Sequence, residues 1–256
     1  MRPFPQVIST AVLENIRIVL SHPQHPGNIG AVARAMKTMG LTDLRLVNPC
    51  EDPTGESRAR ARGGLDILEA AKIHSSLEEA VAGCHTVIGT SARMRGLQYV
   101  VQDPHQLAQD LALNSSMLPA ALLFGREAHG LFNEELALCH RQVFIPANPE
   151  YSSLNLGSAV QIIAYELRMA FLRHEPLPVD LGDLRDLPAS SEHMDELFSH
   201  MHKLATRVEF LKPTASEKLF SRLRRLYLRA QPTLREVNIL RGIMRATEEK
   251  LDDAER

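Results

Sequence analysis

Four glycine-bearing segments in the first 160 residues carry polar side chains that a simple connection between elements does not need. They are residues 25–30 (HPGNIG), 89–93 (GTSAR), 125–131 (GREAHGL) and 145–157 (IPANPEYSSLNLG). Glycines and helix starts leave backbone N–H groups free, and such groups bind a carboxylate or a flat heterocycle. The four segments therefore predict a site for a small molecule that carries groups of this kind.

Each segment also has a purely structural interpretation, which the residues alone leave open. The glycines are typical of tight turns and of close helix packing. Ser153 or Asn155 is a suitable N-terminal cap for the helix predicted after it. The functional interpretation is favoured because each segment follows a predicted strand, and ligands of parallel sheets bind outside the carboxyl ends of the strands.

The elements that position these segments alternate between short apolar runs and helical patterns. Buried strands are predicted at residues 16–20, 44–47, 86–89, 120–124 and 142–145. Helices are predicted at residues 29–39, 63–71, 77–82, 104–113, 132–138 and 156–172. Strands and helices that alternate at this spacing are typical of an α/β domain with a mainly parallel sheet.

The carboxyl-terminal third of the chain differs in charge and in pattern. Between Glu175 and Glu196, seven acidic residues accompany one arginine and three prolines, a composition typical of an extended, solvated linker. We place this linker at residues 174–192, after a first domain of residues 1–173. Residues 193–256 form a separate extension, with helices predicted at residues 194–211, 217–230 and 234–251.

This extension is basic. Between Lys203 and Arg245, eleven lysines or arginines accompany three acidic residues, a local balance of +8, although the net charge of the whole chain is −2. Such a block attracts polyanions, so we expect it to contact nucleic acid, and a solvated helix face or a dimer-stabilising helical hairpin is the alternative. The candidate contacts are Arg222, Arg224, Arg225, Arg229 and Arg241. Further candidates in the first domain are Arg58, Arg60, Arg62, Arg93 and Arg95.

Several familiar kinds of site are missing from the sequence. It contains no Gly-x-Gly-x-x-Gly, no Gly-x-x-x-x-Gly-Lys-Ser/Thr and no Gly-x-Ser-x-Gly segment, which argues against dinucleotide, ATP and serine-hydrolase sites. The histidines lack cysteine or carboxylate partners at ligand spacing, so we expect no metal site. No secretory signal and no run of about 18 apolar residues occurs, so we expect a cytoplasmic protein without membrane contact.

Three of the four segments resemble the signature motifs of the SPOUT (SpoU-TrmD) methyltransferases. The first motif is matched by residues 27–37 (GNIGAVARAMK), the second by residues 123–131 (LFGREAHGL) and the third by residues 148–156 (NPEYSSLNL). In detail they are similar to bacterial tRNA 2'-O-ribose methyltransferases that act on cytidine or uridine at position 32 of the anticodon loop. The likeness continues through residues 218–229 and 238–242, so it covers nearly the whole chain. The loop before the first motif and the first ten residues depart from the pattern.

The resemblance implies S-adenosylmethionine as the methyl donor, tRNA as the substrate, a trefoil knot at the carboxyl-terminal end of the α/β domain, and a homodimer. By motif matching, the residues expected to bind the cofactor are Thr90, Ser91, Ala92, Gly125, Gly130, Ile145, Ser153, Leu154 and Asn155. Arg34 matches the catalytic arginine of the family, and Asn28, Glu127 and Ser153 match the neighbouring catalytic positions. Arg34 and Lys37 are also expected to contact the RNA.

Three other functions stay open. An rRNA 2'-O-methyltransferase has the same three motifs, although a basic extension at the carboxyl terminus favours tRNA. A non-catalytic RNA-binding protein of the same fold is disfavoured by the presence of Arg34, Glu127, Ser153 and Asn155. An enzyme with a different nucleotide cofactor is disfavoured because the phosphate-binding loops are missing.

Overall fold

The computed structural model describes residues 10–51, 53, 55–91, 100–174, 183–211 and 216–254. The chain divides into two compact units, Met1–Val179 and Asp180–Arg256. Among the described residues, no helix is long and apolar enough to cross a membrane.

The first unit is built on a seven-stranded parallel sheet with the strand order β3-β2-β1-β6-β4-β7-β5. The strands are β1 (Ile16–Ser21), β2 (Asp43–Val47), β3 (Lys72–His74), β4 (Thr86–Ser91), β5 (Val100–Gln102), β6 (Ala120–Phe124) and β7 (Arg141–Phe144). The five predicted strands and the mainly parallel α/β fold are confirmed. The sequence analysis missed β3 and β5, three-residue edge strands in which Ile73 and Val100 are about half exposed. The trefoil knot stays a prediction.

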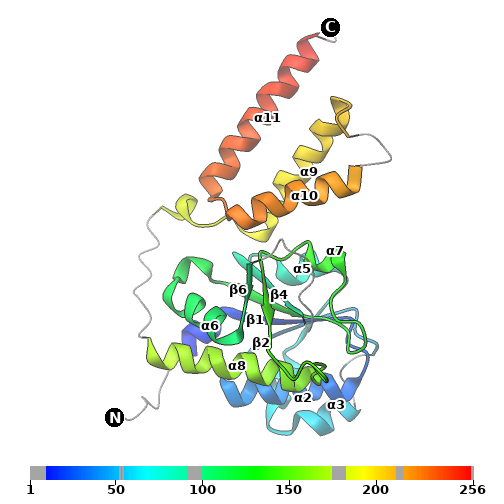
Figure 1. The fold of residues 1–256 in the computed structure, drawn as a ribbon, viewed down its shortest axis with the longest axis vertical. Helices are drawn as coiled ribbons and strands as arrows, with labels where there is room; N and C mark the ends of the chain where they lie inside the picture. The colour runs from blue at the N-terminus through cyan, green and yellow to red at the C-terminus, as the bar shows by residue number, and fades with distance from the viewer. Residues whose placement is uncertain are drawn as a thin grey trace. The chain divides into compact units, whose positions relative to one another are not determined.

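Helices cover both faces of this sheet (Figure 1). They are α1 (Thr10–Leu13), α2 (Pro26–Met39), α3 (Gly55–Ala61), α4 (Leu65–Glu69), α5 (Leu77–Val81), α6 (Pro104–Leu113), α7 (Asn133–Leu136) and α8 (Leu156–Arg173), with short 3-10 turns η1 (Arg62–Gly64) and η2 (Ser115–Met117). Helices α2, α3 and α8 lie on one side of the strands, and α5 and α7 lie on the other (Figure 1). Helices α1 and α3 were not predicted.

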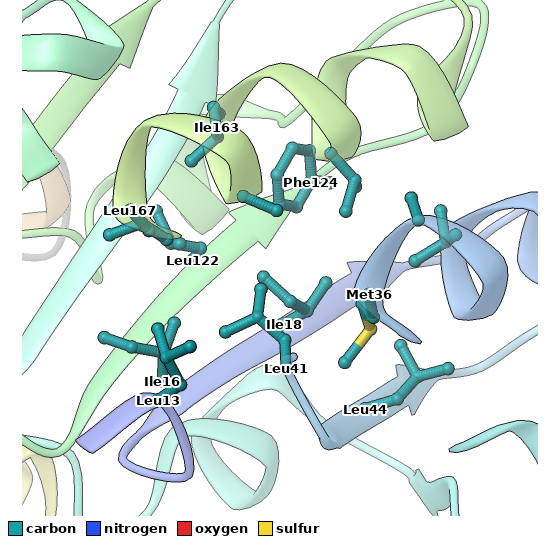
Figure 2. Close-up of a cluster of buried hydrophobic side chains, with 14 of the residues drawn as sticks. Leu13, Ile16, Ile18, Met36, Leu41, Leu44, Leu122, Phe124, Ile163 and Leu167 are labelled. Atoms are coloured by element: carbon teal, nitrogen blue, oxygen red, sulfur yellow. The ribbon is translucent and has the colours of Figure 1, made fainter. Parts of the chain in front are cut away.

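Both faces of the sheet are buried under helices, and the side chains of its central strands alternate between the two faces. On β6, Leu122 and Phe124 belong to the cluster under α2, α6 and α8, whereas Ala121 and Leu123 belong to the cluster under α5 and α7. Figure 2 shows the larger cluster, in which Ile163 of α8 lies above the sheet near Phe124. Strands buried in this way appear in the sequence as continuous apolar runs, which is why they were predicted.

Helix α2 begins at Pro26, three residues earlier than predicted. Proline suits the first helical position because its φ is fixed near the helical value and its missing N–H has no partner there in any case. Gly27, Asn28 and Gly30 therefore lie in the first turns of a helix. Of the two structural interpretations of these glycines, a tight turn is wrong and close helix packing holds, because a Cβ on Gly30 would lie 2.1 Å from the carbonyl oxygen of Ser57 on α3.

The second unit contains η3 (Leu184–Asp186), α9 (Ser191–Arg207), α10 (Ser216–Ala230) and α11 (Leu234–Ala254). The three helices predicted for the extension are confirmed, although α9 begins three residues earlier than expected. They enclose a separate core in which the ring of Phe198 meets the rings of Phe220 and Tyr227 edge to face. All three helices contribute apolar side chains to this core.

Part of the predicted linker packs against this second unit. The N–H of Leu234 donates to the carbonyl of Leu187 (3.0 Å), and the N–H of Ala189 donates to the carbonyl of Pro232 (2.8 Å). Residues 183–190 therefore lie against the start of α11. Residues 175–182, the rest of the acidic stretch, lie outside the described residues.

Candidate active site

A cavity of about 430 Å³ opens at the carboxyl ends of β4, β6 and β7. Its volume is within the range of small-molecule sites, and its walls come from the strand ends and from the loops that follow them. Seven predicted cofactor residues line it, namely Thr90, Ser91, Gly125, Gly130, Ile145, Ser153 and Leu154. Asn155 is not among the lining residues, and Ala92 lies outside the described residues.

The loop after β6 folds back on itself because residue 125 is glycine. The N–H of Arg126 donates to the carbonyl of Gly130 (3.2 Å), and the N–H of Gly130 donates back to the carbonyl of Arg126 (2.8 Å). A Cβ atom on Gly125 would lie 2.1 Å from the carbonyl carbon of Gly130 and 2.2 Å from the nitrogen of Leu131. Only glycine permits this close approach, which forms one wall of the cavity.

Glu127 ties this loop to the start of α2. Its carboxylate accepts hydrogen bonds from the backbone N–H groups of Gln24 (3.0 Å) and His25 (3.2 Å) and from the side-chain amide of Asn28 (2.9 Å). Burial opposes the ionisation of Glu127, but these hydrogen bonds outweigh it and hold the pKa of the carboxyl below its ordinary value. The carboxylate is therefore charged at neutral pH and acts as an acceptor.

Asn155 extends the same chain of hydrogen bonds to the third motif. Its side-chain amide donates to the side-chain oxygen of Asn28 (3.0 Å), and its own side-chain oxygen accepts from the N–H of Gly157 (2.9 Å). Asn155 is thus the N-terminal cap of α8, as its structural interpretation predicted. The same side chain also joins the third motif segment to the first.

A largely buried ion pair that includes Arg126, one of the residues lining the cavity, was not predicted. Nη1 of Arg126 donates to both carboxylate oxygens of Glu135 at 3.0 Å, and Glu135 also accepts from the hydroxyl of Ser21 and from the N–H of Phe132 (2.5 Å). The guanidinium lies 4.0 Å from the centre of the Phe132 ring, which also lines the cavity. The one available sequence signal was a glutamate in the first turn of a predicted helix, where it commonly binds a free backbone N–H.

The two basic residues predicted on α2 are both exposed but differ in their partners. Lys37 forms an ion pair with Asp66 (2.6 Å). Arg34 has no ion pair within the described part of the chain and is not among the residues that line the cavity. It lies one helical turn after Ala31, whose Cβ faces Gly157 at the start of α8.

The predicted RNA-binding residues of the second unit fall into two groups. Arg224 forms an ion pair with Asp195 and lies over the ring of Phe198, and Arg241 forms an ion pair with Glu196 (2.5 Å). The second group consists of Arg222, Arg225 and Arg229, which have no ion pair within the described residues; Arg222 and Arg229 are exposed, and Arg225 is partly exposed.

Together these features define a class of protein. A parallel α/β domain carries a cavity outside the carboxyl ends of its strands, and the cavity is lined by serine, threonine, glycine and apolar residues. Within the described residues, no group of three or more His, Cys, Asp or Glu side chains is placed to hold a metal ion. Parallel α/β domains bind ligands at this edge of the sheet, and the lining of the cavity suits an organic molecule.

Comparison with known families assigns the chain more narrowly. Residues 15–165 match the model of the SpoU rRNA methylase family, and residues 192–256 match the carboxyl-terminal domain of the tRNA methyltransferase TrmJ. The chain therefore belongs to the SpoU methylase family and carries the carboxyl-terminal domain found in TrmJ. The tRNA (cytidine/uridine-2'-O-)-methyltransferase TrmJ of Escherichia coli K12 is 44% identical over 248 residues, which cover 93% of this chain and 97% of the relative.

Solved structures agree with this assignment. The crystal structure of TrmJ from Z. mobilis ZM4 has a TM-score of 0.80 at 32% identity and covers 91% of this chain and 98% of its own. A probable methylase family protein from Haemophilus influenzae has a TM-score of 0.60 at 41% identity, with coverage of 94% and 99%.

Proposed function

We propose that the protein transfers a methyl group from S-adenosylmethionine to the ribose 2'-hydroxyl of cytidine or uridine at position 32 of tRNA. The observation that carries the proposal is the cavity at the carboxyl edge of the sheet, which the second and third motif segments line and which the Glu127–Asn28–Asn155 chain of hydrogen bonds ties to the first. The 44% identity to a TrmJ enzyme over 93% of the chain supports it.

The residues that line the cavity suit the proposed cofactor. Ile145 and Leu154 offer apolar contact for an adenine ring, and the hydroxyls of Thr90, Ser91 and Ser153 offer hydrogen bonds. When bound, S-adenosylmethionine supplies the activated methyl group. The protein has to align the 2'-hydroxyl with that group and favour loss of the hydroxyl proton, and alignment alone contributes about 7 kcal/mol or more in favourable cases.

Arg34 is the proposed catalytic residue. A guanidinium with a pKa above about 12 is a poor proton acceptor at neutral pH, so Arg34 is assigned to a phosphate beside the target ribose and to the negative charge that develops on the oxygen. Ser153 orients the hydroxyl or the cofactor. Asn28 and Glu127 act as positioning residues, because their hydrogen-bonding groups are already engaged in holding the loops together.

The second unit is proposed to bind tRNA. Arg222, Arg225 and Arg229 lie on one side of α10 at spacings of three and four residues, without ion pairs in the described structure. Arg224 and Arg241 stabilise the unit through their acidic partners and contribute less to RNA binding. Removal of residues 180–256 is expected to weaken tRNA binding and flatten its salt dependence while cofactor binding is retained.

A homodimer is also part of the proposal, on the resemblance to the family. The tRNA substrate further implies a cytoplasmic enzyme. Sedimentation velocity of the full chain tests the homodimer directly, because a monomer at micromolar concentration would contradict it.

The decisive experiment combines labelled S-adenosylmethionine, the full chain and unmodified tRNA. Mass spectrometry of the digested tRNA is expected to find a 2'-O-methyl group at position 32. Arg34→Ala is expected to lower kcat by about 100-fold or more, with cofactor binding unchanged, and Arg34→Lys to lower it less. Arg173→Ala is a matched control, since Arg173 is exposed in the last turn of α8 and lies outside the motif segments. Near-normal turnover in both Arg34 variants would contradict the assignment.

An rRNA 2'-O-methyltransferase is the second candidate, because the family model that matches residues 15–165 is described as an rRNA methylase. The match of residues 192–256 to the TrmJ carboxyl-terminal domain favours tRNA. The same assay with rRNA separates the two candidates, and a failure to incorporate label into either RNA would favour a non-catalytic RNA-binding protein.

A further inference from the structure

The short turn η1 places an arginine beside α2 in an unusual backbone conformation. Arg62 has φ of +43°, in the left-handed region that favours glycine, although Gly63 follows it directly. A Cβ on Gly64 would lie 2.6 Å from the carbonyl oxygen of Ala33 and 3.0 Å from the nitrogen of Arg34. The turn is therefore in backbone contact with the helix segment that carries Arg34, and the side chain of Arg62 leaves the chain two residues before that contact.

Ion pairs separate the basic residues of this region into two groups. Three of the five basic residues on α2, α3 and η1 have acidic partners: Lys37 pairs with Asp66 (2.6 Å), Arg58 with Glu69 (2.6 Å) and Arg60 with Glu56 (3.5 Å). Arg34 and Arg62 have none within the described residues, and both are exposed. Two guanidinium groups that lack an ion pair among the described residues thus lie on elements that touch each other.

We propose that Arg62 binds an RNA phosphate next to the one that Arg34 holds. This inference rests on the proposed function and names a further residue for it. Unpaired positive charges on adjoining elements repel each other, and neighbouring phosphodiester groups of an RNA strand relieve that repulsion. A guanidinium suits this role because it binds phosphate oxygens through two parallel N–H groups. Arg62 is a binding residue and takes no part in the chemical step.

The test compares Arg62→Gly, Arg62→Lys and Arg173→Gln in the full chain. Glycine accepts the left-handed conformation, so Arg62→Gly should fold as well as the wild type, which thermal unfolding can check. Arg173→Gln is the matched control because it removes one exposed guanidinium in the last turn of α8, the opposite end of that helix from the third motif segment. Binding of unmodified tRNA is measured at several salt concentrations, together with kcat and KM for tRNA.

Arg62→Gly is expected to weaken tRNA binding several-fold and to reduce the slope of log K against log salt by about 0.7–0.9, with a raised KM and an unchanged kcat. Arg62→Lys should retain most of the slope, and Arg173→Gln should leave it unchanged. The inference is overturned if the wild type methylates tRNA but Arg62→Gly keeps its slope, or if Arg173→Gln lowers the slope equally. A wild type that neither binds nor methylates tRNA would overturn the proposed function and this inference with it.

Discussion

Replacing Glu127 with glutamine tests the chain of hydrogen bonds that joins the three motif segments. Oε2 of Glu127 accepts from the N–H of Gln24 (3.0 Å), and Oε1 accepts from the N–H of His25 (3.2 Å) and the amide of Asn28 (2.9 Å). Glutamine offers one acceptor oxygen and one NH₂ group. All three partners of Glu127 are donors, so the NH₂ group of the glutamine must face at least one N–H group that also donates.

Rotation of the neighbouring amides does not remove this conflict. If the amide of Asn28 turns over, its oxygen can accept from the new glutamine, but its NH₂ group then faces the NH₂ group of Asn155. If Asn155 also turns over, the N–H of Gly157 loses its acceptor. The arrangement with the smallest loss keeps the glutamine oxygen toward His25 and Asn28 and leaves only the N–H of Gln24 without an acceptor.

The expected cost is that of one hydrogen bond to a charged group. Such a bond contributes about 1.5–3 kcal/mol, and the lower value applies because Glu127 is partly exposed. Glu127→Gln should therefore lower the free energy of unfolding of the first unit by about 1.5 kcal/mol at pH 7, seen as a lower urea midpoint with an unchanged slope. Glu134→Gln, at an exposed position of α7, is the control and should change it by less than about 0.5 kcal/mol.

The pH dependence of this difference has a definite sign. Hydrogen bonding lowers the pKa of Glu127 in the folded protein, against the opposing effect of burial. Its stabilising contribution is therefore complete above the ordinary carboxyl pKa and is lost as the pH falls through the folded value. The difference between wild type and variant should be constant from about pH 6 to 8 and shrink below about pH 4. Equal stability at pH 7, or a difference that grows on acidification, would refute the reasoning.

Three further perturbations test other parts of the structure. Gly125→Ala places a Cβ 2.1 Å from the facing backbone, so it should destabilise the first unit by about 1–3 kcal/mol and abolish the calorimetric signal of S-adenosylmethionine binding; normal binding would contradict the loop geometry. Arg224→Ala should destabilise the second unit by about 1–2 kcal/mol, whereas Arg229→Ala should stay within about 0.5 kcal/mol of wild type; equal effects in urea unfolding would contradict the pairing. Iodoacetamide should modify the exposed Cys50 far faster than Cys84, where burial raises the pKa of the thiol to about 11; peptide mass spectrometry would reveal equal rates if this is wrong.

The fold was predictable where it depends on apolar runs. β1 and β6 are buried on both faces, so their sequences contain the continuous apolar runs of a central parallel strand. β3 and β5 exist because a neighbouring strand offers backbone hydrogen bonds to three residues at each edge, and their own side chains are half exposed. The early start of α2 depends on a proline that also suits a turn. Such elements are decided by tertiary contacts.

The candidate site was predictable where its signals are local. Glycines and a helix cap mark the segments, whereas the individual cofactor residues came from the resemblance to the family, and seven of them line one cavity. Apart from the position of Glu135 in the first turn of a predicted helix, the Arg126–Glu135 pair carries no local signal, since both residues resemble ordinary surface charges until the fold buries them. The same holds for Arg224 and Arg241, whose acidic partners on α9 are found only by packing the helices together.

The ion pairs formed in the folded protein, more than the number of basic residues in the sequence, determine which positive charges are available to bind RNA. The acidic residues at 183–196 compensate Arg224, Arg235 and Arg241, so three of the eleven positive charges counted between Lys203 and Arg245 are compensated within their own unit. Counterion release on binding RNA depends on phosphates that gain a cation, and a cation already held by a carboxylate contributes less to it. The salt slope of tRNA binding should therefore be smaller than the number of basic residues suggests, and it should respond most to the arginines that have no acidic partner among the described residues.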